Sequence, residues 1–219
     1  MKIEEFKRDY YLFNPEPYGR IFTLVDFGNV RPWAKDFWPE ENKYKLCVEI
    51  DIIKLGSLCD LVAPERKFFY YGHFHLNEEF PIEDDRNSKY RSSIFRIDKA
   101  RKAGFTVRTK DLKMIPNYDE VGNFMGKTAK CNFDVEMTMD AITKIHRYDT
   151  LMLFSGDSDF GELLKYLKSK DKKVIIVSTR DRMSKELEEV KDHFIPAEPL
   201  KELLKYDNKN STPPLRAEE

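Results

Sequence analysis

Polar and acidic side chains follow two predicted strands of this chain, at the point where each strand ends. They are Asp26 and Asn29 after residues 21–25, and Ser155, Asp157 and Asp159 after residues 150–154. A further carboxylate, Asp134, opens a predicted helix that leads directly into the second of these strands. Because ligands of an open parallel sheet bind beyond the carboxyl ends of its strands, we expect these side chains to share one rim of the sheet.

Carboxylates gathered at one rim repel one another and stay ionised together only where cations neutralise them. Hard oxygen ligands favour Mg²⁺ or Mn²⁺ over zinc. Such ions orient a phosphate, help to deprotonate an attacking water and stabilise the departing oxygen. The residue types at this rim therefore indicate metal-dependent hydrolysis of a phosphodiester.

Each acidic segment also has an ordinary structural interpretation. Asp157 and Asp159 lie where a helix begins, and carboxylates there cap free N–H groups. Asp134 near a helix N-terminus is favoured by the helix dipole, and Asp26 with the residues after it could form a turn. The joint placement of all three segments at one rim favours the functional interpretation.

Short apolar runs alternate with amphipathic segments along the chain. We predict strands at residues 21–25, 67–71, 105–109, 150–154, 173–177 and 194–195, and helices at 45–59, 89–103, 133–146, 160–168 and 183–190. This alternation predicts an α/β fold, with a mostly parallel central sheet sandwiched by helices in a Rossmann-like three-layer architecture. Residues 31–44 and 111–131 are predicted to be long connections, which in compact domains are often functional.

The amino-acid composition narrows the classes of protein to which this chain can belong. Hydrophobic residues make up 41% and aromatics 13% of the 219 residues, which excludes disorder throughout. No apolar run approaches a membrane span, and the first residues lack the apolar segment of a secretory signal. The three cysteines form no CxxC pair, so we expect a reducing, cytoplasmic compartment. The net charge is −1, so any nucleic-acid binding must rest on local patches.

We expect one domain with distinct ends. Residues 1–18 form an aromatic and proline-rich extension, residues 19–204 form the domain, and residues 205–219 form a disordered polar tail. A single domain is the expected outcome for a chain of 219 residues.

The order and spacing of the acidic segments resemble the NYN domain, a branch of the PIN-like, metal-dependent ribonuclease superfamily. The resemblance covers residues 20–180 and rests on Asp26-x-Gly-Asn29, on Lys130 four residues before Asp134, and on the string from Ser155 to Phe160. It implies a parallel sheet between helices and endonucleolytic cleavage of RNA with Mg²⁺ or Mn²⁺. It also implies a set of site residues: Asp26, Asp134 and Asp157 as metal ligands, Asp159 as a further acid, and Asn29 and Ser155 as polar companions.

Two groups of residues are candidates for contacting single-stranded RNA. Trp33 and Trp38 lie close to Arg31 in the sequence. Proteins bind single-stranded nucleic acid with aromatic rings that stack on the bases and cations that contact the backbone. The alternative is that these rings cover an exposed apolar edge of the fold. The second group is basic and surrounds the connection at 111–131: Arg108, Lys110, Lys113, Lys127 and Lys130. Such a run is more often a solvated face, and we expect substrate contacts from Lys130, four residues before Asp134, and from Lys127. Single-stranded DNA as substrate and a homodimeric assembly both stay open.

Other motifs are weaker. The segment from Gly122 to Thr128 resembles a P-loop but is one residue short and no strand precedes it. His73 and His75 have no third ligand in sight, which favours a local structural role. Asp140 lies on a different side of its helix from Asp134, so its part in the site stays open.

Two other functions compete with the nuclease. One is a nucleic-acid-binding or scaffolding module whose site is weak or silent, which the presence of all three carboxylates argues against. The other is a small-molecule phosphatase of the haloacid-dehalogenase type. That chemistry needs a second carboxylate two residues after the first, where this chain has Gly28.

Overall fold

The structure is a computed structural model that describes residues 16–43, 48–62 and 66–206. Most of the expected N-terminal extension, and the polar tail beyond residue 206, lie outside the described residues. None of the helices in the described ranges has the length and apolar character needed to cross a membrane.

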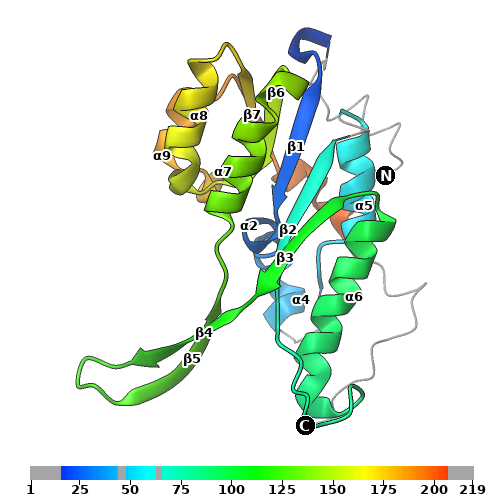
Figure 1. Cartoon of the computed structure of the whole chain (residues 1–219), viewed down its shortest axis with the longest axis vertical. Coiled ribbons are helices and arrows are strands. Elements are labelled where there is room, and N and C mark those ends of the chain that lie inside the picture. Colours follow the sequence, from blue (N-terminus) through cyan, green and yellow to red (C-terminus); the bar gives the residue numbers. More distant parts are fainter. Residues whose placement is uncertain (1–15, 44–47, 63–65, 207–219) are drawn as a thin grey trace.

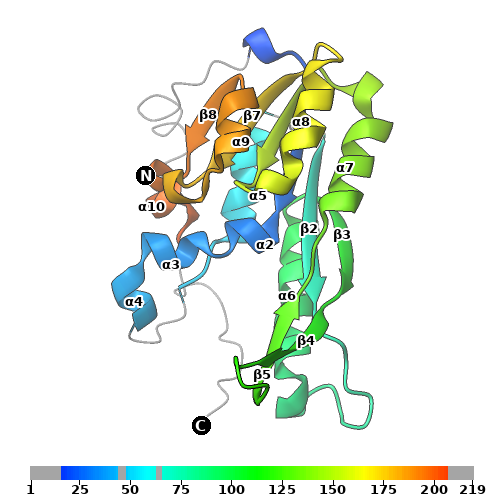
Figure 2. The same cartoon turned by 90° about the vertical axis from the view of Figure 1, so that its left-hand side faces the viewer.

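A six-stranded parallel sheet forms the centre of the molecule (Figures 1 and 2). In spatial order its strands are β3 (Thr106–Asp111), β2 (Lys67–His73), β1 (Ile21–Asp26), β6 (Thr150–Phe154), β7 (Lys173–Ser178) and β8 (His193–Pro196). Strands β2 and β3 follow β1 towards one edge of the sheet, and β7 and β8 follow β6 towards the other edge. The strand order therefore reverses between β1 and β6, and the predicted α/β fold is confirmed.

Helices cover both faces of the sheet and make three layers (Figure 2). One face carries α2 (Phe27–Val30), α3 (Trp33–Phe37), α5 (Ile52–Asp60), α6 (Ser88–Lys102) and α10 (Lys201–Leu204). The other carries α7 (Asp134–Thr143), α8 (Gly161–Lys168) and α9 (Lys185–Val190). The short helix α4 (Pro39–Lys43) follows α3.

Six short 3-10 segments complete the described elements. They are η1 (Glu16–Tyr18), η2 (Asp85–Asn87), η3 (Ile145–Arg147), η4 (Ser158–Phe160), η5 (Arg180–Arg182) and η6 (Glu198–Leu200).

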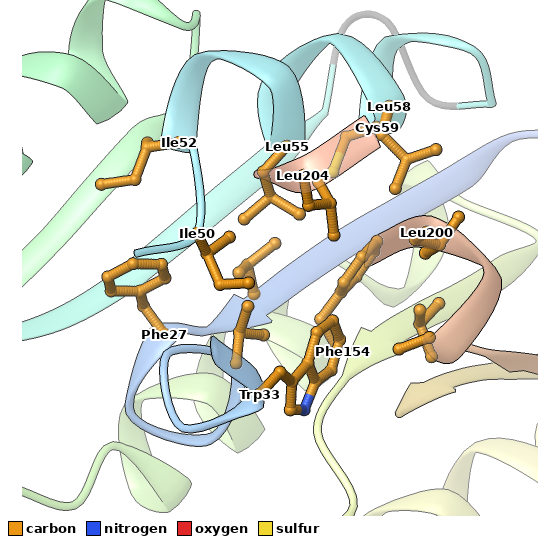
Figure 3. Packing of buried hydrophobic residues seen from close by; sticks show 14 of the residues in the cluster. Phe27, Trp33, Ile50, Ile52, Leu55, Leu58, Cys59, Phe154, Leu200 and Leu204 are labelled. Carbon is orange, nitrogen blue, oxygen red and sulfur yellow. The ribbon is translucent and has the colours of Figure 1, made fainter. Parts of the chain in front are cut away.

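The apolar strands follow from burial on both faces. Along β1, Phe22 and Leu24 point into one hydrophobic cluster, while Ile21 and Val25 point into the other. Successive side chains of a strand alternate between faces, so a doubly covered strand is mostly apolar along its length. Figure 3 shows the cluster beneath α5, where Trp33 packs close to Phe154.

Four predicted segments differ from the structure, and the last of them is the connection at 111–131. Residues 45–47 of the predicted helix at 45–59 lie outside the described residues. The helix described there begins at Ile52, because the Asp51 side chain accepts hydrogen bonds from the N–H groups of Ile53 and Lys54. The predicted connection at 31–44 contains α3 and α4. The predicted helix at 133–146 ends at Thr143 and continues as η3.

The predicted connection at 111–131 is a β-hairpin that projects from the body of the molecule (Figures 1 and 2). Strands β4 (Lys113–Tyr118) and β5 (Phe124–Lys130) pair antiparallel, apart from the main sheet. Their turn is held by Asp119, whose Oδ1 accepts hydrogen bonds from the N–H groups of Val121 and Asn123. Gly122 has a φ of +90°, a backbone conformation that favours glycine.

Candidate functional site

The acidic segments meet at the point where the strand order reverses. Asp26 is the last residue of β1, and Asp157 lies three residues beyond the end of β6. The two strands are direct neighbours, with Val25 opposite Phe154. In open α/β sheets this is where a crevice forms for ligands, so the strand order alone brings the carboxylates of Asp26 and Asp157 together.

The carboxylate of Asp26 is held by the first turn of α2. Its Oδ1 accepts a hydrogen bond from the N–H of Gly28 at 3.0 Å, and its Oδ2 accepts one from the Asn29 side-chain amide at 2.9 Å. Burial raises the pKa of Asp26, and the negative charge of Asp157 raises it further, although the hydrogen bonds from Asn29 and Gly28 oppose the change. A half-buried carboxylate facing another carboxylate favours a nearby cation.

Asp157 and Ser155 form a compact turn after β6. The N–H of Asp157 donates to the Ser155 hydroxyl at 3.3 Å, and the Asp157 Oδ1 accepts from the N–H of Asp159 at 3.1 Å. Ser155 is fully buried, whereas Asp159 is exposed. Asp157 thus caps η4 and at the same time belongs to the acidic rim, so the capping interpretation and the functional one describe the same side chain.

Asp134 reaches the same rim from the first residue of α7. Its N–H donates to the Asn132 side chain at 2.7 Å, which fixes the start of the helix. Burial raises the pKa of Asp134, and the charges of Asp157, Asp159 and Asp26 raise it further. All the carboxylates that the sequence placed at the rim therefore interact electrostatically with Asp134.

A divalent cation fits this site chemically. The donors are carboxylate oxygens, which suit Mg²⁺ or Mn²⁺, and burial, together with their mutual repulsion, raises the pKa values of Asp26 and Asp134. Within the described ranges, however, no three His, Cys, Asp or Glu side chains are already grouped to hold a metal ion. Asp26 and Asp157 each bond instead to an N–H group of the turn that follows.

Gly156 sets the position of Asp157. A Cβ atom at residue 156 would stand 2.0 Å from the carbonyl oxygen of Arg182 and 2.7 Å from the Ser178 hydroxyl. The N–H of Ser184 donates to the Gly156 carbonyl at 3.0 Å. The loop after β7 therefore packs directly on the backbone next to Asp157, which the sequence analysis did not anticipate.

The basic residues near the rim divide into paired and unpaired ones. Arg108 binds Asp140 through two hydrogen bonds of 3.1 Å, and Lys110 binds Glu136 at 2.6 Å. Across the described part of the chain, no carboxylate forms an ion pair with any of three lysines of the hairpin: Lys113, Lys127 and Lys130. These three lysines of the hairpin can therefore take an anionic ligand.

Arg31 forms a longer ion pair than Arg108 or Lys110 does. Its guanidinium lies 3.7 Å from the Glu49 carboxylate, which also pairs with Arg96. The side chain is half exposed and follows α2 directly, so it stays accessible beside the turn that carries Asp26.

Asp140 has a structural role in α7. It is buried and accepts a hydrogen bond from the Tyr70 hydroxyl at 2.9 Å, while Arg108 and Lys144 pair with it. Burial alone would raise the pKa of Asp140, but the bonds from Arg108, Lys144 and Tyr70 outweigh it and the pKa is lowered. This cluster ties α7 to β2 and β3.

Trp33 and Trp38 do not serve as stacking surfaces. Trp33 is 1% exposed and Trp38 is 3% exposed, and both belong to the hydrophobic cluster around α5. Figure 3 shows Trp33 inside that cluster. The expectation that their rings stack on bases is wrong, because the apolar side of the short helix α3 turns them inward.

Two accessible aromatic residues were missed by the sequence analysis. Tyr118 and Phe124 lie opposite each other near the tip of the hairpin and are 62% and 58% exposed. The signal was present in the sequence, because two short runs separated by a turn segment with Asp119 and Gly122 are typical of a β-hairpin. Pro116 within the first run weakened that signal.

Comparison with known proteins agrees with this fold. A curated relative, the "Low amplitude and bright protein LabA" of Synechococcus elongatus, is 33% identical over 92 residues, which are 42% of this chain and 48% of LabA. The chain thus matches about half the length of that relative. A solved structure of VPA0982 from Vibrio parahaemolyticus, a protein of unknown function, has a TM-score of 0.54 at 22% identity, covering 84% of this chain and 96% of that one.

The family match covers most of the domain. The NYN domain model matches residues 37–202, which include Asp134 and Asp157. Strand β1 and Asp26 lie ahead of the matched range but form the centre of the same sheet. The chain belongs to the NYN domain family.

Proposed function

We propose that this protein is a metal-dependent endoribonuclease that hydrolyses phosphodiester bonds of RNA. The observation that carries the proposal is the meeting of Asp26, Asp134 and Asp157 at the reversal of strand order, where Asp134 interacts electrostatically with the other two. Membership of the NYN family supports the same reaction class.

Asp26, Asp134 and Asp157 would hold the cation. A bound Mg²⁺ or Mn²⁺ supplies charge that orients the phosphate and favours deprotonation of an attacking water. Asn29 orients the carboxylate of Asp26, and Ser155 fixes the turn that carries Asp157. Asp159 adds a further negative charge beside Asp134.

The substrate would approach from the side of the hairpin. Lys130 lies four residues before Asp134, at the end of β5. Lys127 lies three residues further along β5, towards the tip of the hairpin. Arg31 follows α2, the short helix that Asp26 caps. These cations would neutralise phosphates next to the acidic rim, which by itself repels a polyanion.

A binding or scaffolding module with a silent site is the second candidate. It is favoured by one observation: the described carboxylates are engaged in turns and do not form a ready group of three metal ligands. Calorimetric titration with Mn²⁺ separates the two candidates, because a silent site releases no heat of binding that depends on Asp157.

The direct test is incubation of labelled single-stranded RNA and DNA with the protein in Mg²⁺, Mn²⁺ or EDTA. We expect cleavage with either metal, none in EDTA, and none for Asp157→Asn. The matched control is Asp171→Asn, which makes the same change of charge just before β7, at the N-terminal end of the strands. Asp171 has a φ of 57°, which asparagine also tolerates.

Undiminished cleavage by Asp157→Asn would remove this residue from the mechanism. A large fall in melting temperature for Asp157→Asn would show instead that its main role is to cap η4.

A further inference from the structure

The hairpin of β4 and β5 lacks the covering layer that the main sheet has. Its large side chains are exposed: Met114 46%, Tyr118 62%, Val121 86%, Phe124 58% and Met125 68%. A two-stranded hairpin is marginally stable in water unless something packs against it. An arm of this length with both faces open is therefore a surface for a ligand or partner.

The strand register divides the arm into two faces, since opposite residues of an antiparallel pair point to the same side. The lysine face consists of Lys113, Ile115, Asn117, Gly126, Thr128 and Lys130. The aromatic face consists of Met114, Pro116, Tyr118, Phe124, Lys127 and Ala129.

On the lysine face, two like charges stand directly opposite each other. Lys113 pairs in register with Lys130, and no carboxylate within the described ranges forms an ion pair with either of them. Like charges in this position destabilise a strand pair. Lys110, by contrast, has Glu136 as partner. An unpaired lysine couple is explained if a phosphate chain lies over it.

On the aromatic face, Tyr118 and Phe124 form an edge-to-face pair with ring centroids 6.1 Å apart. This geometry leaves ring surface open to solvent, and both residues are more than half exposed. Lys127 lies on the same face, opposite Pro116, which is two positions nearer the base of the hairpin than Tyr118. Exposed rings beside a cation are the elements with which proteins hold single-stranded nucleic acid.

We propose that the hairpin is an arm that grips single-stranded RNA beyond the cleavage rim. Lys113 and Lys130 contact phosphates at its base, and the Tyr118–Phe124 pair stacks on a base near its tip. This inference rests on the proposed function for its choice of RNA. It deepens that function by requiring a substrate with an unpaired segment long enough to reach from the rim onto the arm.

Charge complementarity favours RNA over a second copy of this chain. A symmetric contact places the same patch of both copies face to face. Contact between two lysine faces would then bring four lysines together without an acid to balance them, whereas an RNA strand supplies one negative charge per nucleotide.

The test is fluorescence anisotropy with a labelled single-stranded RNA in EDTA, so that cleavage does not interfere. Lys113→Gln/Lys130→Gln should flatten the dependence of log affinity on log salt by about 1.4, from ~0.7 for each lost phosphate contact. Tyr118→Ala/Phe124→Ala should weaken binding roughly 5- to 150-fold at an unchanged salt slope. Lys102→Gln/Lys170→Gln, on exposed lysines outside the arm, is the matched control.

Arm variants should melt like the wild type, since the arm lies outside both hydrophobic clusters. RNA affinity and salt slope equal to the control in both arm variants would overturn the inference. So would a loss of dimer in sedimentation for Tyr118→Ala/Phe124→Ala with RNA affinity unchanged, because the arm would then join two chains. Arm-dependent RNA binding without any cleavage would contradict the proposed nuclease and leave the arm's role standing.

Discussion

The carbonyl oxygen of Arg182 occupies the place where a side chain on Gly156 would begin, 2.0 Å from the position of its Cβ. The Arg182 side chain meanwhile binds Asp36 through contacts of 2.7 and 3.2 Å. One residue of the loop after β7 thus fixes both the turn before Asp157 and the helix α3. Residue 156, in the string from Ser155 to Phe160, must therefore be glycine for the loop after β7 to pack next to Asp157.

Gly156→Ala should therefore destabilise the protein and weaken metal binding together. Moving the Arg182 backbone away costs about 1–3 kcal/mol of unfolding free energy, as for other overpacked sites. It also strains the hydrogen bond between Ser184 and Gly156. Urea unfolding and Mn²⁺ calorimetry measure both effects. Gly161→Ala is the control, because its Cβ would meet its nearest neighbour at 3.5 Å; equal stability of the two variants would contradict the prediction.

Asp140→Asn should lower stability without changing metal affinity. The substitution leaves Arg108, Lys144 and the Tyr70 hydroxyl without their shared carboxylate, and the loss of hydrogen bonds to a charged group costs roughly 1.5–3 kcal/mol. Glu136→Gln, about one helical turn closer to the rim and more exposed, is the comparison. Reduced Mn²⁺ affinity in a stable Asp140→Asn protein would instead place this residue in the site.

Trp38→Phe should leave RNA affinity unchanged while lowering the melting temperature. The indole is buried and packs at an angle of 84° to the Phe37 ring, so it offers no surface to a base. A smaller ring leaves a cavity, which destabilises a core. Fluorescence anisotropy with labelled RNA measures the affinity, and thermal unfolding of the same sample measures the melting temperature. A folded Trp38→Phe protein with weaker RNA binding would show that α3 opens in solution.

Stability should fall in acid partly through Asp149. Hydrogen bonds from Arg20 and its positive charge hold the pKa of Asp149 at about 2, below the ordinary carboxylate value of about 3.9. A lowered folded-state pKa adds stability above the ordinary value, and this stability is lost as the pH falls towards 2. Arg20→Gln should flatten the melting temperature against pH in this window. An unchanged profile would show that the pair is broken in solution.

The sequence predicted the sheet and the acidic rim because both follow from local patterns. The alternation of apolar and amphipathic segments placed all six main strands, and the residues just after β1 and β6 identified Asp26 and Asp157. Burial on both faces makes such strands recognisable. The strand order itself depends on contacts between distant segments, which a local pattern does not contain.

The errors arose where a side chain's environment is set by packing far along the chain. Nothing near Trp33 in sequence shows that it belongs to one buried cluster with residues of α5 and α10, such as Leu55 and Leu204 (Figure 3). Similarly, the role of Gly156 depends on Arg182, a residue on another strand's loop. Residue type and spacing predict chemistry better than they predict exposure.

The pairing of β1 with β6 also sets the order of events during synthesis. Ile21 lies beside Thr150, so the central contact of the sheet closes only after most of the chain has left the ribosome. Closing such a long segment is slow compared with forming helices or hairpins. The two central acids meet at that same step. A growing chain therefore contains the whole sequence of the hairpin before its two central acids can meet, and the acidic rim cannot form until β6 has emerged.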